Sequence, residues 1–413
     1  MSTDRRGHGS LPQLVAAMAA TWSLVGAGPA LGEASPPAQA VADDGVFLPY
    51  AAAPARPVGV CIVDSGVDVN RDTQGQIAFR EAIDGGDPGD VAANKHGTRM
   101  AMMAAAAVNG WGMIGTAPGA VRIVSVRILS PGSDAASYPG YVRGIAECRR
   151  YQPRYNIKVI SLSLGNPRGG DDPTVAAQID SARDYGMDVL AAAGNASTPT
   201  ADFPASYPPV LSVAAMNRSR GLCAFTDRGP AIRLLAPGCG LDSADPVTGA
   251  PGFSVEAGTS EATAIAAAAL GALRAYRPDL TTDQAEGLIT ASAGGRLDLA
   301  AAFRAAGLGS VIALGAARAR QYAPRIPPPR ASLGRRGRRL VLSLRARPRG
   351  VRALVRVRGR RGPSGRVGTL RALEVKGPRI SFPAAGAVSV SVRYADAGHP
   401  GKRGREVTLR VPR

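Results

Sequence analysis

The chain has 413 residues, 45% of them apolar, and a formal net charge of +19, which together exclude a largely disordered polypeptide. The charge is unevenly distributed, because residues 318–413 contain 26 Lys and Arg against 3 Asp and Glu, whereas residues 1–317 carry a net charge of −4. This break predicts a near-neutral domain followed by a strongly basic one.

The first forty residues have the pattern of a secretory signal peptide. Arginines at positions 5 and 6 precede an apolar run over 14–31, and residues 38–40 (Ala-Gln-Ala) fit a cleavage site between small residues. An uncleaved membrane anchor is the alternative, but Gly and Pro interrupt a run that is barely long enough to span a bilayer. We therefore expect a signal peptide at 1–40, a short extension at 41–57, and a secreted mature protein without a transmembrane segment.

Short apolar, β-branched runs alternate with helical runs after residue 57. Continuous apolar strands separated by helices are typical of a parallel sheet that is buried on both faces. In such sheets the reactive groups collect at the carboxyl ends of the strands. The sequence therefore predicts a doubly wound, mostly parallel α/β domain at 58–315. Its expected strands are 58–64, 121–129, 157–165, 187–195 and 210–215, and its expected helices are 97–107, 138–151, 173–185 and 259–276.

Four cysteines suit an oxidising compartment. Cys223 and Cys239 lie close together across an expected loop, so we predict a disulfide between them. Cys61 lies in an expected strand and Cys148 in an expected helix, and for these two a pair of buried free thiols is an equally good interpretation.

The basic part of the chain divides into a linker and a second domain. Residues 316–334 are rich in Pro, Arg and Ala and are predicted to form the linker. Residues 335–413 alternate with period two between recurrent Gly and Pro turns, which predicts a small antiparallel β-sandwich.

The basic charge of residues 335–413 could hold an anionic cell-envelope polymer. The alternative is a solvated domain without a specific ligand, because 46 Arg against 4 Lys indicates a compositional bias. Nucleic acid is a disfavoured partner, since few aromatic residues are available for base stacking.

His96 is the only histidine between His8 and His399, and it stands where a polar loop meets the helix at 97–107. A histidine at such a position can act as a general base, although capping or packing is the alternative. Asp64 directly follows six apolar strand residues and could orient an imidazole at the carboxyl end of the strand. Aspartates that end strands are also common turn formers.

Two further polar residues lie at element ends. Ser260 is in the first turn of the helix at 259–276, near the positive end of the helix dipole, although serine is also an ordinary N-terminal cap. Asn195 ends the strand at 187–195 and could aim its amide at an oxyanion, or simply occupy a turn.

The order Asp64, His96, Asn195, Ser260 is more specific than any one of these residues. With the stretches IVDSGVD, HGT, SLSLG, AAAGN, VLSVAA, LLAPG and GTSEA, it makes residues 58–304 similar to the catalytic domain of the subtilisin-like serine proteases, the subtilases. The Asp…His…Ser order separates this family from the α/β-hydrolases and the chymotrypsin-like enzymes.

The resemblance implies a secreted serine endopeptidase that cleaves polypeptides through an acyl-enzyme and needs no cofactor for the chemistry. Ser260 resembles the nucleophile, His96 its general base, and Asp64 the residue that fixes the imidazole. Asn195 resembles an oxyanion donor. The implied substrate-binding residues are Ser161, Leu162, Ser163, Leu164 and Gly165, similar to the family strand that pairs with an extended substrate, together with Ala193 and Gly194.

Several positions depart from the family pattern. Arg99 replaces the second histidine of HGTH, and Glu261 and Ala264 replace the usual Met and Pro after the serine. Val-Asn-Arg at 69–71 replaces His-Pro-Asp, and only about 20–30 residues precede Asp64 after the expected cleavage, too few for an inhibitory pro-domain. These departures motivate an alternative: a catalytically inactive subtilase-like scaffold that acts as a secreted binding protein through its basic domain.

The loop DGGDPGD at 84–90 gathers three aspartates before His96. Carboxylate oxygens of this kind can bind calcium. Their spacing does not match a defined calcium loop, however, so a structural calcium ion is compatible with these residues but unsupported. We expect a solvated acidic loop and predict no metal site.

Overall fold

A computed structural model describes residues 48–109, 112–133, 136–165, 170–217, 219–249, 254–291, 293–322, 330–336, 339–345, 351–361, 366–375, 379–383, 387–396 and 407–411. The expected signal peptide lies outside these residues. Within the described part of the chain, no helix combines the length and the apolar character needed to cross a membrane.

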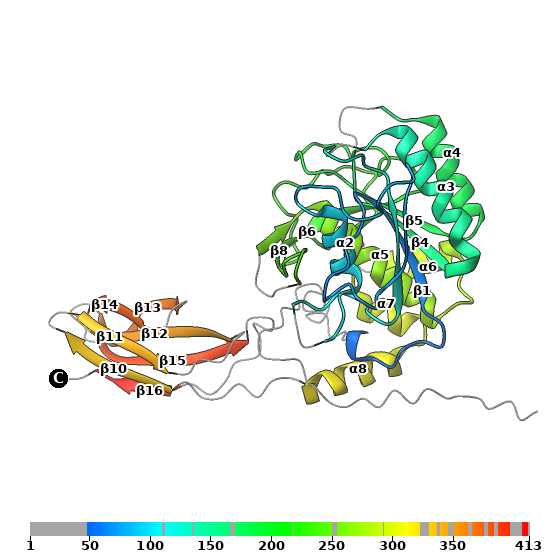
Figure 1. The fold of residues 1–413 in the computed structure, drawn as a ribbon. Helices are drawn as coiled ribbons and strands as arrows, with labels where there is room; N and C mark the ends of the chain where they lie inside the picture. The colour runs from blue at the N-terminus through cyan, green and yellow to red at the C-terminus, as the bar shows by residue number, and fades with distance from the viewer. Residues whose placement is uncertain are drawn as a thin grey trace, which may run out of the picture.

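A parallel sheet forms the centre of the first domain (Figure 1). It has seven strands in the order β2-β3-β1-β4-β5-β6-β7. All seven residues of β1 are buried, which explains why its sequence is continuously apolar. The predicted doubly wound sheet is confirmed, and β2 and β7 were not predicted as strands. The bounds are β1 (Val58–Asp64), β2 (Ile77–Ala82), β3 (Val121–Arg127), β4 (Ile157–Leu162), β5 (Asp188–Ala192), β6 (Leu211–Met216) and β7 (Leu234–Pro237).

Helices pack on both faces of the sheet. On one face α2 (His96–Ala105) and α5 (Thr259–Tyr276) form one apolar core, and on the other α3 (Tyr138–Tyr155) and α4 (Pro173–Asp184) form a second (Figure 1). The many alanines of α5 allow the helix to be buried along almost its whole length. The domain is completed by η1 (Leu48–Tyr50), β8 (Cys239–Ser243), β9 (Ser254–Ala257), α6 (Thr282–Thr290), η2 (Ala293–Gly295), α7 (Leu299–Ala305) and α8 (Gly309–Tyr322).

The order of the strands positions the candidate site. Because β1 lies between β3 and β4, the chain leaves the sheet toward opposite sides at this point. A crevice forms at the carboxyl ends of parallel strands where the order reverses in this way. Asp64, the last residue of β1, stands at that crevice.

Two disulfides tie the first domain together. Cys223 and Cys239 are bridged, as predicted. Cys61 on β1 and Cys148 on α3 are also bridged, so the interpretation of these two as free thiols was wrong. The strand and the helix pack against each other, which brings together two cysteines that are 87 residues apart in the sequence.

Two antiparallel sheets form the C-terminal domain, with strand orders β10-β11-β14 and β13-β12-β15-β16. Apolar residues of both sheets enclose one core, as the period-two pattern predicted. The bounds are β10 (Arg330–Arg336), β11 (Arg339–Arg345), β12 (Val351–Arg361), β13 (Arg366–Val375), β14 (Arg379–Pro383), β15 (Ala387–Asp396) and β16 (Val407–Arg410).

The predicted linker at 316–334 is only partly outside regular structure. Helix α8 continues to Tyr322, because Ala and Arg are good helix formers, and β10 begins at Arg330. Residues 323–329, which include most of the prolines, lie outside the described residues.

Candidate active site

Asp64 and His96 are hydrogen-bonded at the carboxyl end of β1. The Nδ1 atom of His96 lies 2.8 Å from Oδ1 of Asp64, and the imidazole side chain keeps 20% of its surface exposed while the carboxylate is buried. The backbone N–H of Ser65 donates to the same Asp64 oxygen at 2.7 Å, which fixes the carboxylate. A neutral imidazole held in this way carries its proton on Nδ1 and leaves Nε2 as an acceptor.

Asp90 anchors the loop that carries His96. Its Oδ1 accepts from the Ser65 hydroxyl at 2.8 Å, and its Oδ2 accepts from the backbone N–H and the hydroxyl of Thr98 at 2.8 and 2.7 Å. The Ser65 hydroxyl in turn accepts from the N–H of Gly97. Asp90 is buried, so the prediction of a solvated acidic loop was wrong for this residue, which connects the end of β1 to the start of α2.

The other two aspartates of this loop are also engaged by the protein. Asp84 accepts from the Arg127 guanidinium at 2.5 Å, and Asp87 accepts from the N–H of Gly89 at 2.8 Å. Among the residues that the structure describes, no group of three or more His, Cys, Asp or Glu is arranged to hold a metal ion.

Ser260 lies in the first turn of α5, where the backbone N–H groups of the helix point toward the crevice. Its hydroxyl donates to the carbonyl oxygen of Ser163 at 2.8 Å, and the Ser163 hydroxyl donates to the carbonyl oxygen of Ser260 at 3.3 Å. The start of α5 is thereby joined to the segment that follows β4.

Asn195 is oriented by the residue before Ser260. The backbone N–H and the hydroxyl of Thr259 both donate to Oδ1 of Asn195, at 2.9 and 3.1 Å. The N–H of Gly194 donates to the Thr259 hydroxyl at 3.3 Å, which holds the two segments together. With its oxygen bound on this side, the Asn195 side chain is exposed and has its Nδ2 donors available to a ligand.

Two residues that depart from the family pattern belong to one ionic cluster next to Ser260. Nη1 of Arg99 lies 2.5 Å from Oε2 of Glu256, and both side chains are largely buried. Glu261, also buried, is close enough for the charges of His96, Glu256 and Arg99 to affect its pKa, which burial raises above its usual value. Arg99 therefore compensates carboxylates that the first turn of α5 brings inside the protein.

His96 is surrounded by negative charge. Burial disfavours its protonated form, but the charge of Asp64 and the hydrogen bond to it, together with the charges of Glu261 and Asp90, raise the pKa of His96 to about 9. An opposite charge at short distance favours the charged form of a group in this way. The ring is thus a stronger base than an isolated histidine.

The predicted substrate-binding residues divide into two groups. Ser161 and Leu162 lie inside β4 and pair with both β1 and β5, so their backbone groups are not available to a peptide. Ser163, Leu164 and Gly165 follow the end of that strand. The prediction therefore narrows to these three residues, because a peptide can add only to an unpaired strand edge. Ala193 and Gly194 follow β5 directly and lie beside them in the neighbouring connection.

Sequence reasoning missed the residues that hold this arrangement in place, chiefly Asp90 and Thr259. It also missed Asp202 and Asp227, whose carboxylates lie behind Gly194. Each of these four is a common loop or cap residue, and nothing in its local sequence distinguishes it.

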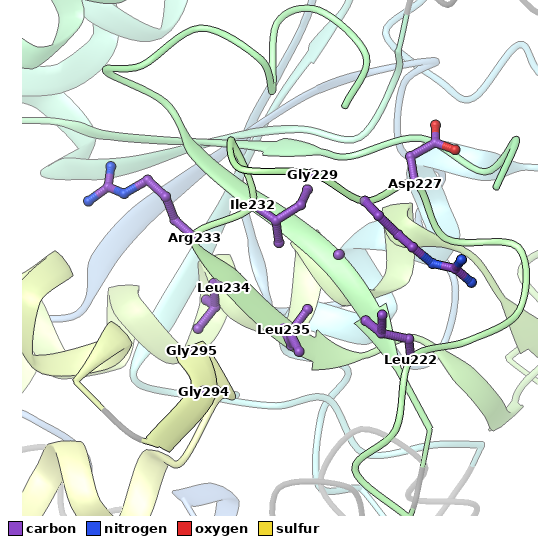
Figure 2. Close-up of a pocket in the computed structure, with 11 residues that line it drawn as sticks. Leu222, Asp227, Gly229, Ile232, Arg233, Leu234, Leu235, Gly294 and Gly295 are labelled. Carbon is purple, nitrogen blue, oxygen red and sulfur yellow. The ribbon is translucent and has the colours of Figure 1, made fainter. Parts of the chain in front are cut away.

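A separate pocket of about 210 Å³ lies beside β7. Figure 2 shows it lined by Leu222, Ile232 and Leu235, with the Asp227 carboxylate turned away from these apolar side chains. None of Asp64, His96, Asn195 or Ser260 lines it, so it is not the candidate active site.

Comparison with known proteins agrees with this geometry. A family model described as the Subtilase family matches residues 56–314. The chain is 30% identical to alkaline elastase from Bacillus sp. (strain YaB) over 206 residues, which are 50% of this chain and 51% of the relative. It is 30% identical to subtilisin Savinase from Lederbergia lenta over 227 residues, 55% of this chain and 80% of the relative.

A solved structure of a protease from Pseudoalteromonas arctica PAMC 21717 is similar to this fold. The TM-score is 0.55 at 25% sequence identity, and the match covers 66% of this chain and 95% of the other. The chain therefore spans about half the length of the alkaline elastase but nearly all of this solved chain.

Proposed function

The chain belongs to the subtilase family, and from that premise we propose that it is a secreted serine endopeptidase that hydrolyses polypeptides through an acyl-enzyme on Ser260. The observation that carries this proposal is the 2.8 Å contact between Asp64 and Nδ1 of His96, because it leaves Nε2 to accept a proton.

In the proposed first step, Oγ of Ser260 attacks the carbonyl carbon of the scissile bond, and its proton passes to Nε2 of His96. Asp64 stabilises the imidazolium that forms. His96 then gives the proton to the leaving amine as the C–N bond breaks, and the acyl-enzyme remains. Water then attacks the carbonyl carbon of the acyl-enzyme while His96 takes a proton from it. His96 gives this proton to Oγ of Ser260 as the ester C–O bond breaks and the carboxylic acid leaves.

The oxyanion that forms on the carbonyl oxygen needs hydrogen-bond donors that are already in position. Nδ2 of Asn195 and the backbone N–H of Ser260 are our proposed donors. The backbone N–H and the hydroxyl of Thr259 both donate to Oδ1 of Asn195. These two hydrogen bonds support the role of Asn195, because they fix which end of its amide faces the crevice.

Ser260 must change its hydrogen bond before it reacts. Its hydroxyl donates to the carbonyl oxygen of Ser163, so the hydroxyl must rotate to turn its proton toward His96. Contacts between a nucleophile and its base are often long in ligand-free proteins and shorten when substrate binds. A peptide that pairs with Ser163–Gly165 would favour this rotation by competing for the Ser163 carbonyl.

The decisive experiment is labelling of the secreted, full-length protein with a fluorophosphonate probe. We expect covalent labelling of the wild type, none of Ser260→Ala, and strongly slowed labelling of His96→Ala. Ser206→Ala, at a serine hydroxyl outside the site, is the matched control and should label normally. Correctly folded wild-type protein that does not react would contradict the proposed activity.

Asn195→Ala tests the oxyanion role separately. We expect a loss of roughly 10²-fold in kcat with little change in KM, a magnitude that comes from the oxyanion donor of subtilisin. An unchanged kcat would remove Asn195 from the mechanism.

The inactive-scaffold alternative is less well supported than the protease. Arg99, which motivated it, is accounted for by the ion pair with Glu256, and Ala264 is a buried residue within a helix that begins at Thr259 without proline. A role of the basic C-terminal domain in binding an anionic cell-envelope polymer remains our proposal for that domain. A variant without residues 323–413 should lose surface retention and keep its peptidase activity, and unchanged retention would contradict this role.

A further inference from the structure

Two carboxylates that the proposed mechanism does not use meet behind Gly194. A Cβ atom built on Gly194 would collide with Oδ2 of Asp227 and would lie only 2.5 Å from Oδ2 of Asp202. Gly194 has a φ of 112°, in the region that favours glycine. The absence of a side chain at this residue therefore leaves room for two acidic oxygens at one point.

Asp227 is held rigidly with one oxygen unused. Its Oδ1 accepts from the backbone N–H groups of Ala196 and Thr198 at 3.0 and 2.7 Å. Its own N–H donates to the carbonyl oxygen of Gly194 at 3.0 Å. The side chain is 0% exposed, and Oδ2 has no hydrogen-bond partner among the described residues. A buried carboxylate oxygen without a partner is costly unless a ligand satisfies it.

Asp202 faces that oxygen from the more open side. Its backbone N–H donates to the carbonyl oxygen of Ala193 at 2.8 Å, while its side chain is half-buried. Burial, followed by the charge of Asp227, raises the pKa of the Asp202 carboxyl above its usual value. Within the described part of the chain, no Lys or Arg forms an ion pair with either aspartate.

This pair lies between the two segments that flank the nucleophile. Oδ2 of Asp202 is 2.5 Å from the Cβ position of Gly194, which precedes Asn195, and 3.1 Å from the Cβ position of Gly165. Gly165 is two residues after Ser163, whose carbonyl oxygen holds the Ser260 hydroxyl. A side chain that enters between these two glycine-containing segments next to Ser260 therefore ends at Asp202.

We propose that Asp202, backed by Asp227, closes the pocket for the substrate side chain on the acyl side of the scissile bond and selects lysine or arginine there. This inference rests on the proposed function, because it names the substrate class of the same site. Because Gly165 and Gly194 carry no side chains, Oδ2 of Asp202 lies at both segments, where the cationic end of a long substrate side chain would pair with it and satisfy the charge of Asp227.

The charge arrangement favours a cationic side chain over an apolar one. An apolar side chain would remove Asp202 from water while it faces a second carboxylate, which is unfavourable. A cation in the same place forms a charge-assisted hydrogen bond and cancels the repulsion between the carboxylates.

The test compares peptide amides that differ only in the residue on the acyl side of the scissile bond: Arg, Lys, Phe, Leu and Glu. For the full-length enzyme we expect kcat/KM for Arg and Lys to exceed that for Phe and Leu by roughly 100-fold, and Glu to be the poorest. Asp202→Asn should lower kcat/KM for Arg by roughly 100-fold and leave the Phe peptide within a few-fold. A wild type that prefers Phe or Leu would overturn the proposal.

Two controls separate pocket selectivity from damage to the site. Asp171→Asn, an exposed aspartate outside the pocket, should keep the preference for Arg and Lys. Fluorophosphonate labelling of Asp202→Asn reports whether Ser260 is still reactive in this variant, because the probe has no cationic group. If Asp202→Asn labels normally but retains the wild-type preference for Arg, the pocket assignment is wrong while the proposed protease function stands.

A binding measurement keeps the inference testable even if the proposed catalysis fails. The fluorescent cation p-aminobenzamidine should bind the full-length Ser260→Ala variant, and binding should weaken by at least 10-fold when Asp202→Asn is added. Absence of binding in a folded Ser260→Ala protein would overturn the inference without reference to activity.

Discussion

Two pairs of carboxylates, Glu256 with Glu261 and Asp202 with Asp227, differ in how their charge is compensated. Glu256 and Glu261 share the interior with Arg99, which forms an ion pair with Glu256 at 2.5 Å. Asp202 and Asp227 face each other behind Gly194 without a cation from the described residues. The comparison teaches that acidic residues beside an active site can serve either as part of the framework or as a binding site, and that the presence of an internal cation distinguishes the two.

The energetic reason is the cost of a buried charge. A buried carboxylate with a partner is close to neutral in its contribution to stability, whereas one without a partner is destabilising. Glu256 and Glu261, the framework pair, therefore have little to gain from a ligand. Asp202 and Asp227, the pocket pair, include one oxygen without a hydrogen-bond partner, and the free energy of satisfying that oxygen is available for binding.

The largest expected effect on stability is at Gly194, next to the pocket pair. Gly194→Ala should lower the free energy of unfolding by about 4 kcal/mol, because it combines a positive φ with a collision against two carboxylates. Gly119→Ala is the matched control: its φ is also positive, at 80°, but nothing lies within 4 Å of its Cβ position. It should cost only about 1 kcal/mol. Equal losses in urea denaturation would show that the crowding at Gly194 is absent.

The next largest effect concerns the framework pair. Arg99→Met should destabilise the protein by about 3 kcal/mol, because it leaves buried carboxylates without their cation. Adding Glu256→Gln should recover part of that loss. Chemical denaturation of the two single variants and the double variant gives the coupling free energy, and additive losses would contradict a direct interaction.

A change of opposite sign is expected at the pocket pair. Asp227→Asn keeps the oxygen that accepts from Ala196 and Thr198 and places an amide N–H group opposite Asp202. It should raise the free energy of unfolding by about 1 kcal/mol and weaken the preference for Arg substrates. Glu256→Gln by itself should be destabilising, and the same sign for both variants would remove the distinction between the two pairs.

The smallest expected effect is a shift of the pH profile of kcat/KM when Glu261 of the framework pair is replaced. His96 must be neutral to accept a proton, and its pKa is raised to about 9. We therefore expect kcat/KM to increase with pH up to a plateau above about pH 9. The charges of Asp64, Glu261 and Asp90 raise the pKa of His96. Glu261→Gln removes one of these three charges, so the increase in kcat/KM should begin at lower pH. A pH profile that Glu261→Gln leaves unchanged would contradict the electrostatic contact.

The same pKa links His96 to stability. Because its pKa in the folded protein exceeds the ordinary value of about 6.5, the protonated ring stabilises the fold fully below pH 6.5. That contribution is lost as the pH rises to about 9. Denaturation midpoints of wild type and His96→Gln should therefore differ more at pH 6 than at pH 10.

Local sequence was sufficient for the elements that carry the candidate site. The strand at 58–64 and the helix at 259–276 have the predicted bounds, because one is continuously apolar and the other is rich in alanine and ends before Pro278. Strand ends were less predictable: the strand expected at 157–165 ends at Leu162, and Ser161 and Leu162 pair with strands on both sides within β4.

By itself, the sequence determined the fold class, the order Asp64, His96, Asn195, Ser260 and the family. Each of these depends on periodicity, on composition or on a motif that is contiguous along the chain. Only the tertiary structure decided which charges meet. Arg99 and Glu256 are 157 residues apart, and Asp202 and Asp227 come together only because Gly194 has no side chain between them. A pairing across the fold is decided by how strands and helices pack, and an isolated aspartate in a loop carries no local sign of the partner it will face.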